Sequence, residues 1–314
     1  MHVLCFASVV ACGSGAGDAP VDPPIPPPAA IASISVSPSL LKLTPGATGQ
    51  LSAEARQANG AVMSDAVVSW TSSAPNVVSV DRGTVMAIAD GSAIITAQSG
   101  GHNASATVTV ETLYDVDANG VPRFIGRDYI DLSKITRVSR FRSGIGHDYS
   151  DDVERCRSMK HYFQPPGSVD WGSIVIAAPV TGTVASLQSE TTFGTQVQIV
   201  PAAQRAFTVI LFHVKPNASL AVGTAVSAGE SIGTHIGSQT MSDVAIRVKT
   251  PRGQRYVSYF DAMADSLFQS YATRGVPSRG AMIIGTAERD SSPLTCSGEQ
   301  FQSAGVLNNW IDLQ

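Results

Sequence analysis

Seven short runs of alternating apolar and polar residues follow one another at intervals of roughly ten residues between positions 31 and 111. In the first run, Ile34 and Val36 alternate with serines. Such alternation points apolar side chains to one face of a strand and polar side chains to the other. Because turn residues separate the runs, the pattern predicts an antiparallel β-sandwich over 31–111. We expect Trp70 to be buried between its two sheets.

The particular residues of this segment also indicate a protein family. Segment 31–111 closely resembles the bacterial Ig-like domain, group 2, and that resemblance implies a spacer or adhesive module of a surface protein. The fold alone does not choose between these roles. His102 lies in a Gly-Gly-His-Asn turn, where we expect it to be solvated. The matching residues are Val36 to Pro38, Leu43, Pro45-Gly46, Trp70 to Ser72, Val77 to Asp81, Gly83 and Gly91 to Thr96.

Composition excludes several other classes of protein. A chain of 314 residues is long enough for about two domains with hydrophobic cores. Apolar residues make up 43% and charged residues 15%, which is not the composition of a disordered chain. The net charge of −4 and the lack of a basic run give no reason to expect nucleic acid as a partner. No apolar run approaches the ~20 residues that span a bilayer.

The N-terminal residues predict export. A short apolar stretch, Val3–Ala11, precedes Cys12, and Val9-Val10-Ala11-Cys12 resembles the lipobox of bacterial lipoproteins. The resemblance implies lipidation of Cys12, and the alternatives are an ordinary secretory signal or a chance apolar start. We therefore interpret 1–19 as a leader and the proline-rich residues 20–30 as a semi-rigid linker. The expected location is the bacterial cell envelope, lipid-anchored or else periplasmic or extracellular, with membrane contact only through the anchor.

Two cysteines, Cys156 and Cys296, remain once the leader is set aside. In an oxidising compartment, two cysteines most simply form one disulfide. A metal-binding thiolate at Cys156 is the alternative reading.

Residues 141–250 predict a second β domain, which follows a connector at 112–140. Its strands are separated by glycine-rich corners, as in small β-barrels. In the order of its strands and in their residues, this region resembles the lysostaphin-type zinc endopeptidases of bacterial cell walls. The matching segments are Ala178–Val184, Thr208–Val214, Val222–Gly233 and Ser242–Val248.

The resemblance implies a site that this sequence only partly retains. In that family, a His-x-Gly-x-Asp strand and a final His-x-His supply three zinc ligands and one catalytic histidine, and a separate histidine supplies the other. The preferred register matches Asp148 to the ligand Asp and His213 to the first catalytic histidine. It places Gly144 and Ala245 at the two other ligand positions and Asp243 at the second catalytic position. A lone carboxylate does not hold zinc, so we expect no metal or other cofactor.

A second register keeps the zinc reading open. His147 and Asp151 have the family's four-residue offset, and His161 lies in the following insertion. A rebuilt zinc site would use His147, Asp148, Asp151 and His161, with His213 close by. In the preferred register, we expect Asp148 and His213 to face one another across a groove with Asp243 at its edge. A polar cluster that only supports the loop is the other interpretation. The predicted groove consists of His147, Asp148, Asp151, His161, His213 and Asp243.

The tail, 251–314, departs from the family pattern. Its apolar residues recur at helical spacing before a glycine, which predicts one core-packed helix and then a tail tied down by Cys296. The spaced residues are Tyr256, Phe260, Met263, Leu267 and Tyr271.

These observations combine into a prediction of function. We expect a mostly β envelope protein, whose Ig-like module presents a catalytically degenerate endopeptidase-like domain. This domain would bind cell-wall glycan or peptide, or an envelope protein. His213 and Asp243 would then be vestiges of a catalytic pair. The alternative is an active zinc-dependent peptidoglycan endopeptidase with a rearranged metal site.

Overall fold

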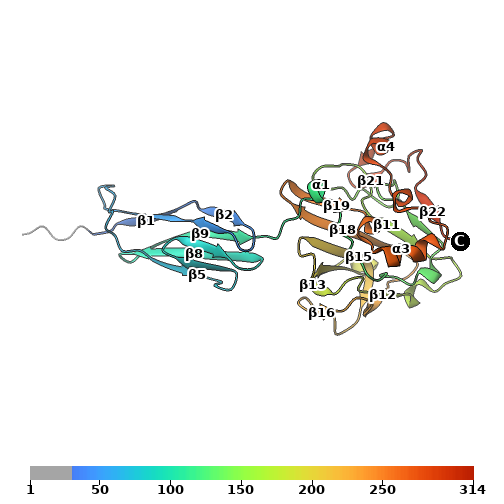
Figure 1. Ribbon diagram of the computed structural model, residues 1–314, viewed down its shortest axis with the longest axis horizontal. Helices are drawn as coiled ribbons and strands as arrows, with labels where there is room; N and C mark the ends of the chain where they lie inside the picture. Colours follow the sequence, from blue (N-terminus) through green and yellow to red (C-terminus); the bar gives the residue numbers. More distant parts are fainter. Residues whose placement is uncertain (1–29) are drawn as a thin grey trace, which may run out of the picture.

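The computed structural model describes residues 30–314 and shows two β domains in succession (Figure 1). The leader, Cys12 and the proline-rich linker up to residue 29 lie outside the described residues. Within 30–314, no helix combines the length and apolar character needed to cross a membrane. The predicted mostly β fold, with an Ig-like sandwich first, is confirmed.

The first domain has nine strands in three small sheets, which explains the short spacing of the sequence runs. β2, β9, β8 and β5 form one sheet in that order, β3, β7 and β6 form another, and β1 pairs with β4. The strands are β1 (Ser33–Ser37), β2 (Leu40–Leu43), β3 (Thr48–Gln50), β4 (Ser52–Arg56), β5 (Ser69–Ser72), β6 (Val78–Asp81), β7 (Thr84–Ala87), β8 (Gly91–Ser99) and β9 (His102–Val110).

The core of this domain consists of side chains that alternate along these strands. Leu51, Val78, Val85 and Ile95 are buried completely or nearly so. Trp70 packs against this core, as expected, but part of its side chain is exposed, so it is less buried than we expected. Its indole lies beside the β6–β7 turn, at the rim of the core.

The second domain is built on an eleven-stranded sheet. Its main path runs β16-β13-β14-β15-β18-β11-β10-β22, with β12, β17 and β19 attached to it. The strands are β10 (Arg137–Ser139), β11 (His161–Gln164), β12 (Val175–Ala177), β13 (Gly182–Ser189), β14 (Thr195–Pro201), β15 (Phe207–Pro216), β16 (Ala225–Val226), β17 (Ser231–His235), β18 (Ser242–Thr250), β19 (Gly253–Val257) and β22 (Trp310–Asp312).

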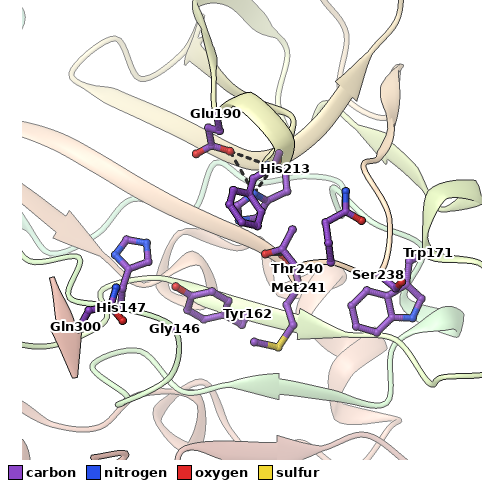
Figure 2. A pocket seen from close by; sticks show the side chains of 12 residues that line it. Gly146, His147, Tyr162, Trp171, Glu190, His213, Ser238, Thr240, Met241 and Gln300 are labelled. Atoms are coloured by element: carbon purple, nitrogen blue, oxygen red, sulfur yellow. Dashed lines mark hydrogen bonds and ion pairs between the residues drawn. The ribbon is translucent and has the colours of Figure 1, made fainter. Parts of the chain in front are cut away.

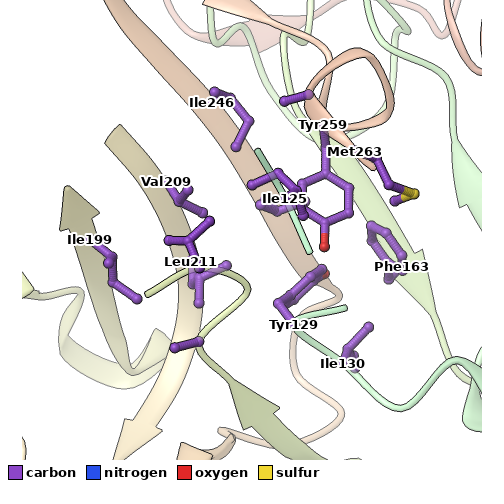
Figure 3. Packing of buried hydrophobic residues seen from close by; sticks show 14 of the residues in the cluster. Ile125, Tyr129, Ile130, Phe163, Ile199, Val209, Leu211, Ile246, Tyr259 and Met263 are labelled. Carbon is purple, nitrogen blue, oxygen red and sulfur yellow. The ribbon is translucent and has the colours of Figure 1, made fainter. Parts of the chain in front are cut away.

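The segment 112–140, expected to be a connector, is part of the second domain. Ile125, Tyr129 and Ile130 are buried in the same core as Leu211 and Phe163 of the sheet (Figure 3). The segment contains α1 (Val116–Asn119) and, close to its end, β10, which pairs with β11. A fragment that begins at 141 would therefore lack core residues.

The single helix expected over 256–271 is two short helices, α2 (Tyr259–Ala262) and α3 (Asp265–Ala272). Tyr256 belongs to β19, where it pairs with Arg247. The helix breaks at Met263–Ala264, because Met263 forms a bridge with Ile125 and the Ala264 amide donates to the Ile125 carbonyl. The apolar spacing thus correctly predicts burial, but pairing with other segments overrides the helical period.

The predicted disulfide between Cys156 and Cys296 is confirmed, with 5.8 Å between the two Cα atoms. It joins the loop before β11 to the hairpin of β20 (Cys296–Ser297) and β21 (Gln300–Phe301), which follows α4 (Thr286–Ser291). The Asp148 amide also donates to the Glu299 carbonyl at 2.7 Å. The tail is therefore fastened to the loop 143–156, and Gln300 reaches the pocket described next.

Candidate functional site

A pocket of about 660 Å³ lies where the loop 143–156, β15 and the segment before β18 meet (Figure 2). Aromatic side chains and polar groups share its wall, and His213 projects into it beside Glu190. The lining residues are Gly146, His147, Tyr162, Trp171, Glu190, Phe193, His213, Ser238, Gln239, Thr240, Met241 and Gln300.

A β-bulge gives His213 its position. Between the pairs Val197–Leu211 and Thr195–Val214, β15 has two residues where β14 has one. Leu211 and Val214 therefore both face the main core, and His213 is the extra residue, with a φ of 60°. Bulges beside functional sites re-aim a side chain in this way, and a positive φ outside glycine is costly unless the surroundings hold it.

A fully buried ion pair lies next to His213. Lys160 Nζ is 2.9 Å from Asp243 Oδ2, and the two side chains are 2% and 0% exposed. His213 Nε2 lies 3.1 Å from the other oxygen, Oδ1, at ion-pair distance but without hydrogen-bond alignment. Asp243 is on β18 and Lys160 directly precedes β11, which pairs with β18. Continuing that register places Lys160 opposite Ala245, whose small side chain leaves room for the lysine stem.

His147 completes a chain of polar groups at the other end of the ion pair. Its Nε2 lies 3.3 Å from Lys160 Nζ, and its Nδ1 lies 2.9 Å from the Asp148 carbonyl oxygen. A carbonyl oxygen only accepts, so Nδ1 carries the proton and Nε2 presents a lone pair to the ammonium. The chain therefore runs His147–Lys160–Asp243–His213, with both histidines lining the pocket.

Gly146 is required where this loop crosses Tyr162. Its φ is 76°, and a β-carbon there would lie on the Tyr162 hydroxyl. Only glycine permits both the left-handed backbone and the close approach.

The electrostatics of the cluster favour charged forms. Burial alone would raise the pKa of Asp243, but Lys160 and His213 hold it below its usual range. Burial would likewise lower the pKa of His213, but Asp243 and Glu190 outweigh it and raise that pKa to about 10. His213 is therefore an imidazolium at neutral pH, and it has no free lone pair with which to bind a metal ion or accept a proton.

Two carboxylates of the expected groove do not join this cluster. Asp148 accepts from the Ser150 hydroxyl and from the Arg157 amide, and it does not line the pocket. Asp151 accepts from the amide of Tyr256 and from the side chain of Arg255. The expectation that Asp148 faces His213 is wrong, because the loop uses both carboxylates to satisfy its own backbone and to fasten itself to β19.

The other assigned positions also differ from expectation. His161 points to the opposite side of β11, where its Nδ1 donates to the Ser139 carbonyl and its Nε2 contacts the Ser258 hydroxyl. Gly144 packs against the backbone of Ala304 rather than beside Asp243. Ala245 is buried in an apolar cluster with Phe212. The strand that pairs with Asp243 is β11, which begins at His161, and the loop 144–150 lies outside it.

These side chains do not fit a zinc ion. A catalytic zinc needs three deprotonated protein ligands. The carboxylate of Asp243 faces an ammonium and an imidazolium, and an alanine is its neighbour on the same face of β18. In the part of the chain that the structure describes, no three His, Cys, Asp or Glu side chains are grouped to hold a metal ion.

The sequence analysis assigned no role to Lys160. Its pairing with Asp243 depends on the register between β11 and β18, which are far apart in the sequence. The pocket residues Trp171, Glu190 and Phe193 carry no motif, and no local signal identifies them.

The comparison with family models identifies the first domain. Residues 30–110 match the bacterial Ig-like domain, group 2. This match confirms the resemblance drawn from the sequence. No curated protein sequence matches the chain.

The solved structures that match this chain have low overall similarity to it. Domains 4 and 5 of the S-layer protein SbsC are 22% identical over 26% of this chain, with a TM-score of 0.24, and the chain spans only 53% of their length. A zinc-containing peptidase from Vibrio cholerae is 14% identical over 69% of this chain and 78% of its own, with a TM-score of 0.30. The SpoIIQ–SpoIIIAH pore-forming complex is 13% identical over 47% of this chain and 96% of its own, with a TM-score of 0.32.

Proposed function

We propose that this is a bacterial cell-envelope protein whose second domain binds a cell-wall peptide or glycan in the pocket without hydrolysing it. The observation that carries the proposal is the buried Lys160–Asp243 ion pair beside an open pocket. The pocket supplies the surface for a ligand. The ion pair supplies the reason that hydrolysis does not follow.

The walls of the pocket suit a ligand that is partly polar and partly apolar. Phe193 is 46% exposed and Trp171 also lines the pocket, while Ser238 to Thr240 and Gln300 offer hydrogen-bonding groups. Binding sites commonly combine aromatic surface with a few placed polar groups. Muropeptides and glycan chains present both kinds of surface.

Hydrolysis would need an activated water, and the cluster offers no group to activate it. The ammonium of Lys160 occupies one oxygen of Asp243, and the charged ring of His213 contacts the other. A protonated His213 donates a hydrogen bond to a ligand but does not act as a general base. The second domain therefore holds and orients its ligand.

Two sequence features support the location. The Cys156–Cys296 disulfide is typical of proteins from oxidising compartments. The apolar leader and Cys12 lie ahead of the Ig-like module, so a lipid anchor on Cys12 would place that module between the membrane and the binding domain. In this arrangement, the Ig-like module acts as a spacer.

Binding is tested by sedimentation with purified peptidoglycan. We expect the wild-type protein to pellet with it and Phe193→Ala to bind about ten-fold more weakly, as removal of a contact worth roughly 1.4 kcal/mol would produce. The matched control is Val175→Ala, since Val175 on β12 is equally exposed, at 45%, but does not line the pocket. Equal loss in both variants, or no pelleting of the wild type, contradicts the proposal.

Hydrolysis and metal content are measured on the same samples. We expect no release of soluble muropeptides and no stoichiometric zinc. One zinc per chain together with muropeptide release that a chelator abolishes would instead establish the endopeptidase with a rearranged site.

A further inference from the structure

The pair Lys160–Asp243 is unusual because both charges are removed from water. Its Nζ–Oδ2 distance of 2.9 Å joins two neighbouring strands of the sheet, and neither side chain is more than 2% exposed. Moving two charges out of water is costly, and their attraction offsets the cost only when the geometry is good. A reaction that removes both charges would abolish this cost.

Aromatic rings surround the ammonium of Lys160. Its Nζ lies 3.7 Å from the ring centre of Phe212 and 4.3 Å from that of Tyr149, with Tyr162 at 5.7 Å. This surrounding excludes water, which would otherwise solvate the ions and hydrolyse a product. The pair is therefore held away from bulk water, although its charges still attract one another.

Each partner also has a histidine placed to move a proton. The lone pair of His147 Nε2 faces Lys160 Nζ at 3.3 Å, so it is positioned to accept a proton from the ammonium. His213 Nε2 lies 3.1 Å from Asp243 Oδ1, on the side of the carboxylate that Lys160 does not occupy. A base on the amine and an acid on the carboxylate are the two groups that amide formation requires.

We propose that Lys160 and Asp243 join in an intramolecular isopeptide bond, assisted by His147 and His213. His147 takes one proton from Nζ, and the neutral amine attacks Cγ of Asp243, whose oxygen accepts a proton from His213. The Nζ–Cγ bond forms, the Cγ–O bond breaks, and that oxygen leaves as water with the His213 proton and a second proton from Nζ. The proton on His147 returns to His213 through solvent in the pocket that both rings line. The net reaction converts an ammonium and a carboxylate into an amide and one water, with no oxidant or other reactant.

The product fits the fold and the proposed role without depending on the pocket's ligand. The amide would tie β11 to β18 across 83 residues of sequence, and it would be a second covalent link besides the disulfide. An envelope protein that resists proteases and mechanical load benefits from such a link. The bond also fixes the strand that carries Asp243 next to the pocket.

The test is the mass of the denatured protein. The purified full chain is reduced, alkylated and denatured, and its intact mass is compared with that of its sequence. We expect the wild type to be lighter by one water, and peptide mapping to show a branched peptide that contains Lys160 and Asp243. A wild-type chain at full mass, with both residues recovered in linear peptides, overturns the proposal.

Variants assign the bond and the roles of the histidines. Lys160→Arg keeps the charge but removes the nucleophile, and it should show full mass. His213→Ala and His147→Ala keep both reacting groups, and bond formation in each should slow on the order of 100-fold, which leaves a large uncross-linked fraction shortly after synthesis. An unchanged rate in both histidine variants overturns their proposed role.

Two controls keep the outcome clear. Asp90 precedes Gly91, so a succinimide at that step is another way to lose one water. Loss of water mapped to Asp90 rather than to a branched peptide counts against the proposal. If Lys160→Arg does not fold, the histidine variants still decide the question, because their ion pair is intact.

Discussion

The two faces of β11 hold two buried clusters of opposite electrical character. On one face, Lys160 and Asp243 form an ion pair with His213 beside them. On the other face, His161 lies between the Ser139 carbonyl and the Ser258 hydroxyl and packs against Phe260, and among residues 30–314 it has no charged partner. Successive residues of a strand point to opposite faces, so one step along the chain separates the two environments.

The difference shows what decides the charge of a buried histidine. Burial lowers the pKa of His161 to about 4, because no nearby carboxylate offsets the loss of water. Burial acts on His213 as well, but Asp243 and Glu190 reverse it and raise that pKa to about 10. At neutral pH, one ring is a neutral part of the core and the other is a cation at the pocket.

The largest expected effect comes from Asp243→Ala, which disrupts the ion pair on the charged face of β11. This substitution leaves the ammonium of Lys160 buried without its carboxylate, and we expect the free energy of unfolding to fall by about 3–5 kcal/mol. Urea unfolding followed by tryptophan fluorescence measures it. In the double variant Lys160→Met/Asp243→Ala no unpaired charge remains, so the part of the loss that comes from the buried ammonium should be recovered. A single variant as stable as the wild type would show that the pair is not buried as described.

The neutral environment of His161, on the other face of β11, is tested by measuring stability at lower pH. The pKa of His161 is lower in the folded state than its ordinary value of 6.5, so its contribution to stability is complete above pH 6.5. As the pH falls toward 4, the unfolded chain binds a proton that the folded chain does not. The difference between the unfolded and folded pKa values corresponds to a loss of about 3 kcal/mol.

The measurement compares unfolding free energies between pH 7 and pH 4. The variant His161→Gln should lose less stability over this range than the wild type, and His102→Gln, at the exposed start of β9 in the Ig-like domain, should behave as the wild type does. Identical slopes for wild type and His161→Gln would show that His161 is not neutral and buried.

Local sequence patterns were sufficient for much of the fold. The alternation over 31–111 determines which faces of the strands are buried, and this holds whatever the neighbouring strand is. The disulfide followed because only two cysteines remained after the leader. Trp70 was misjudged because alternation says which face a residue is on but not how near it lies to the rim of the core.

The site depended on contacts that local patterns do not contain. His213 and Asp243 were correctly named as members of one polar cluster, but Asp148 was assigned on a motif, and its loop is held by the tail instead. Lys160 acquires its role only through the register of β11 against β18. The bulge that turns His213 toward the pocket has no sequence signal in the run Thr208–Val214, whose pattern is typical of an ordinary strand.

The smallest expected effect concerns the rim of the charged face. Glu190 is 25% exposed, and its Oε2 lies 3.2 Å from His213 Nδ1, opposite the contact with Asp243. Partly exposed ion pairs contribute about 1 kcal/mol or less, so Glu190→Gln should lower the pKa of His213 by less than about one unit. A titration of the His213 ring followed by NMR measures it.

The same titration reports on the state of Asp243. Because the folded pKa of His213 is raised, the contribution of His213 to stability is complete below pH 6.5 and is lost as the pH rises through about 10. Glu190→Gln shifts that loss to lower pH. While Asp243 is a carboxylate, it still holds most of the proton affinity of the ring, and the shift stays small. Once Asp243 is an amide, Glu190 is the remaining carboxylate against the ring, so the pKa of His213 should already lie within about one unit of its ordinary value before Glu190 is replaced. The pKa of the wild-type ring therefore distinguishes the ion pair from the covalent bond.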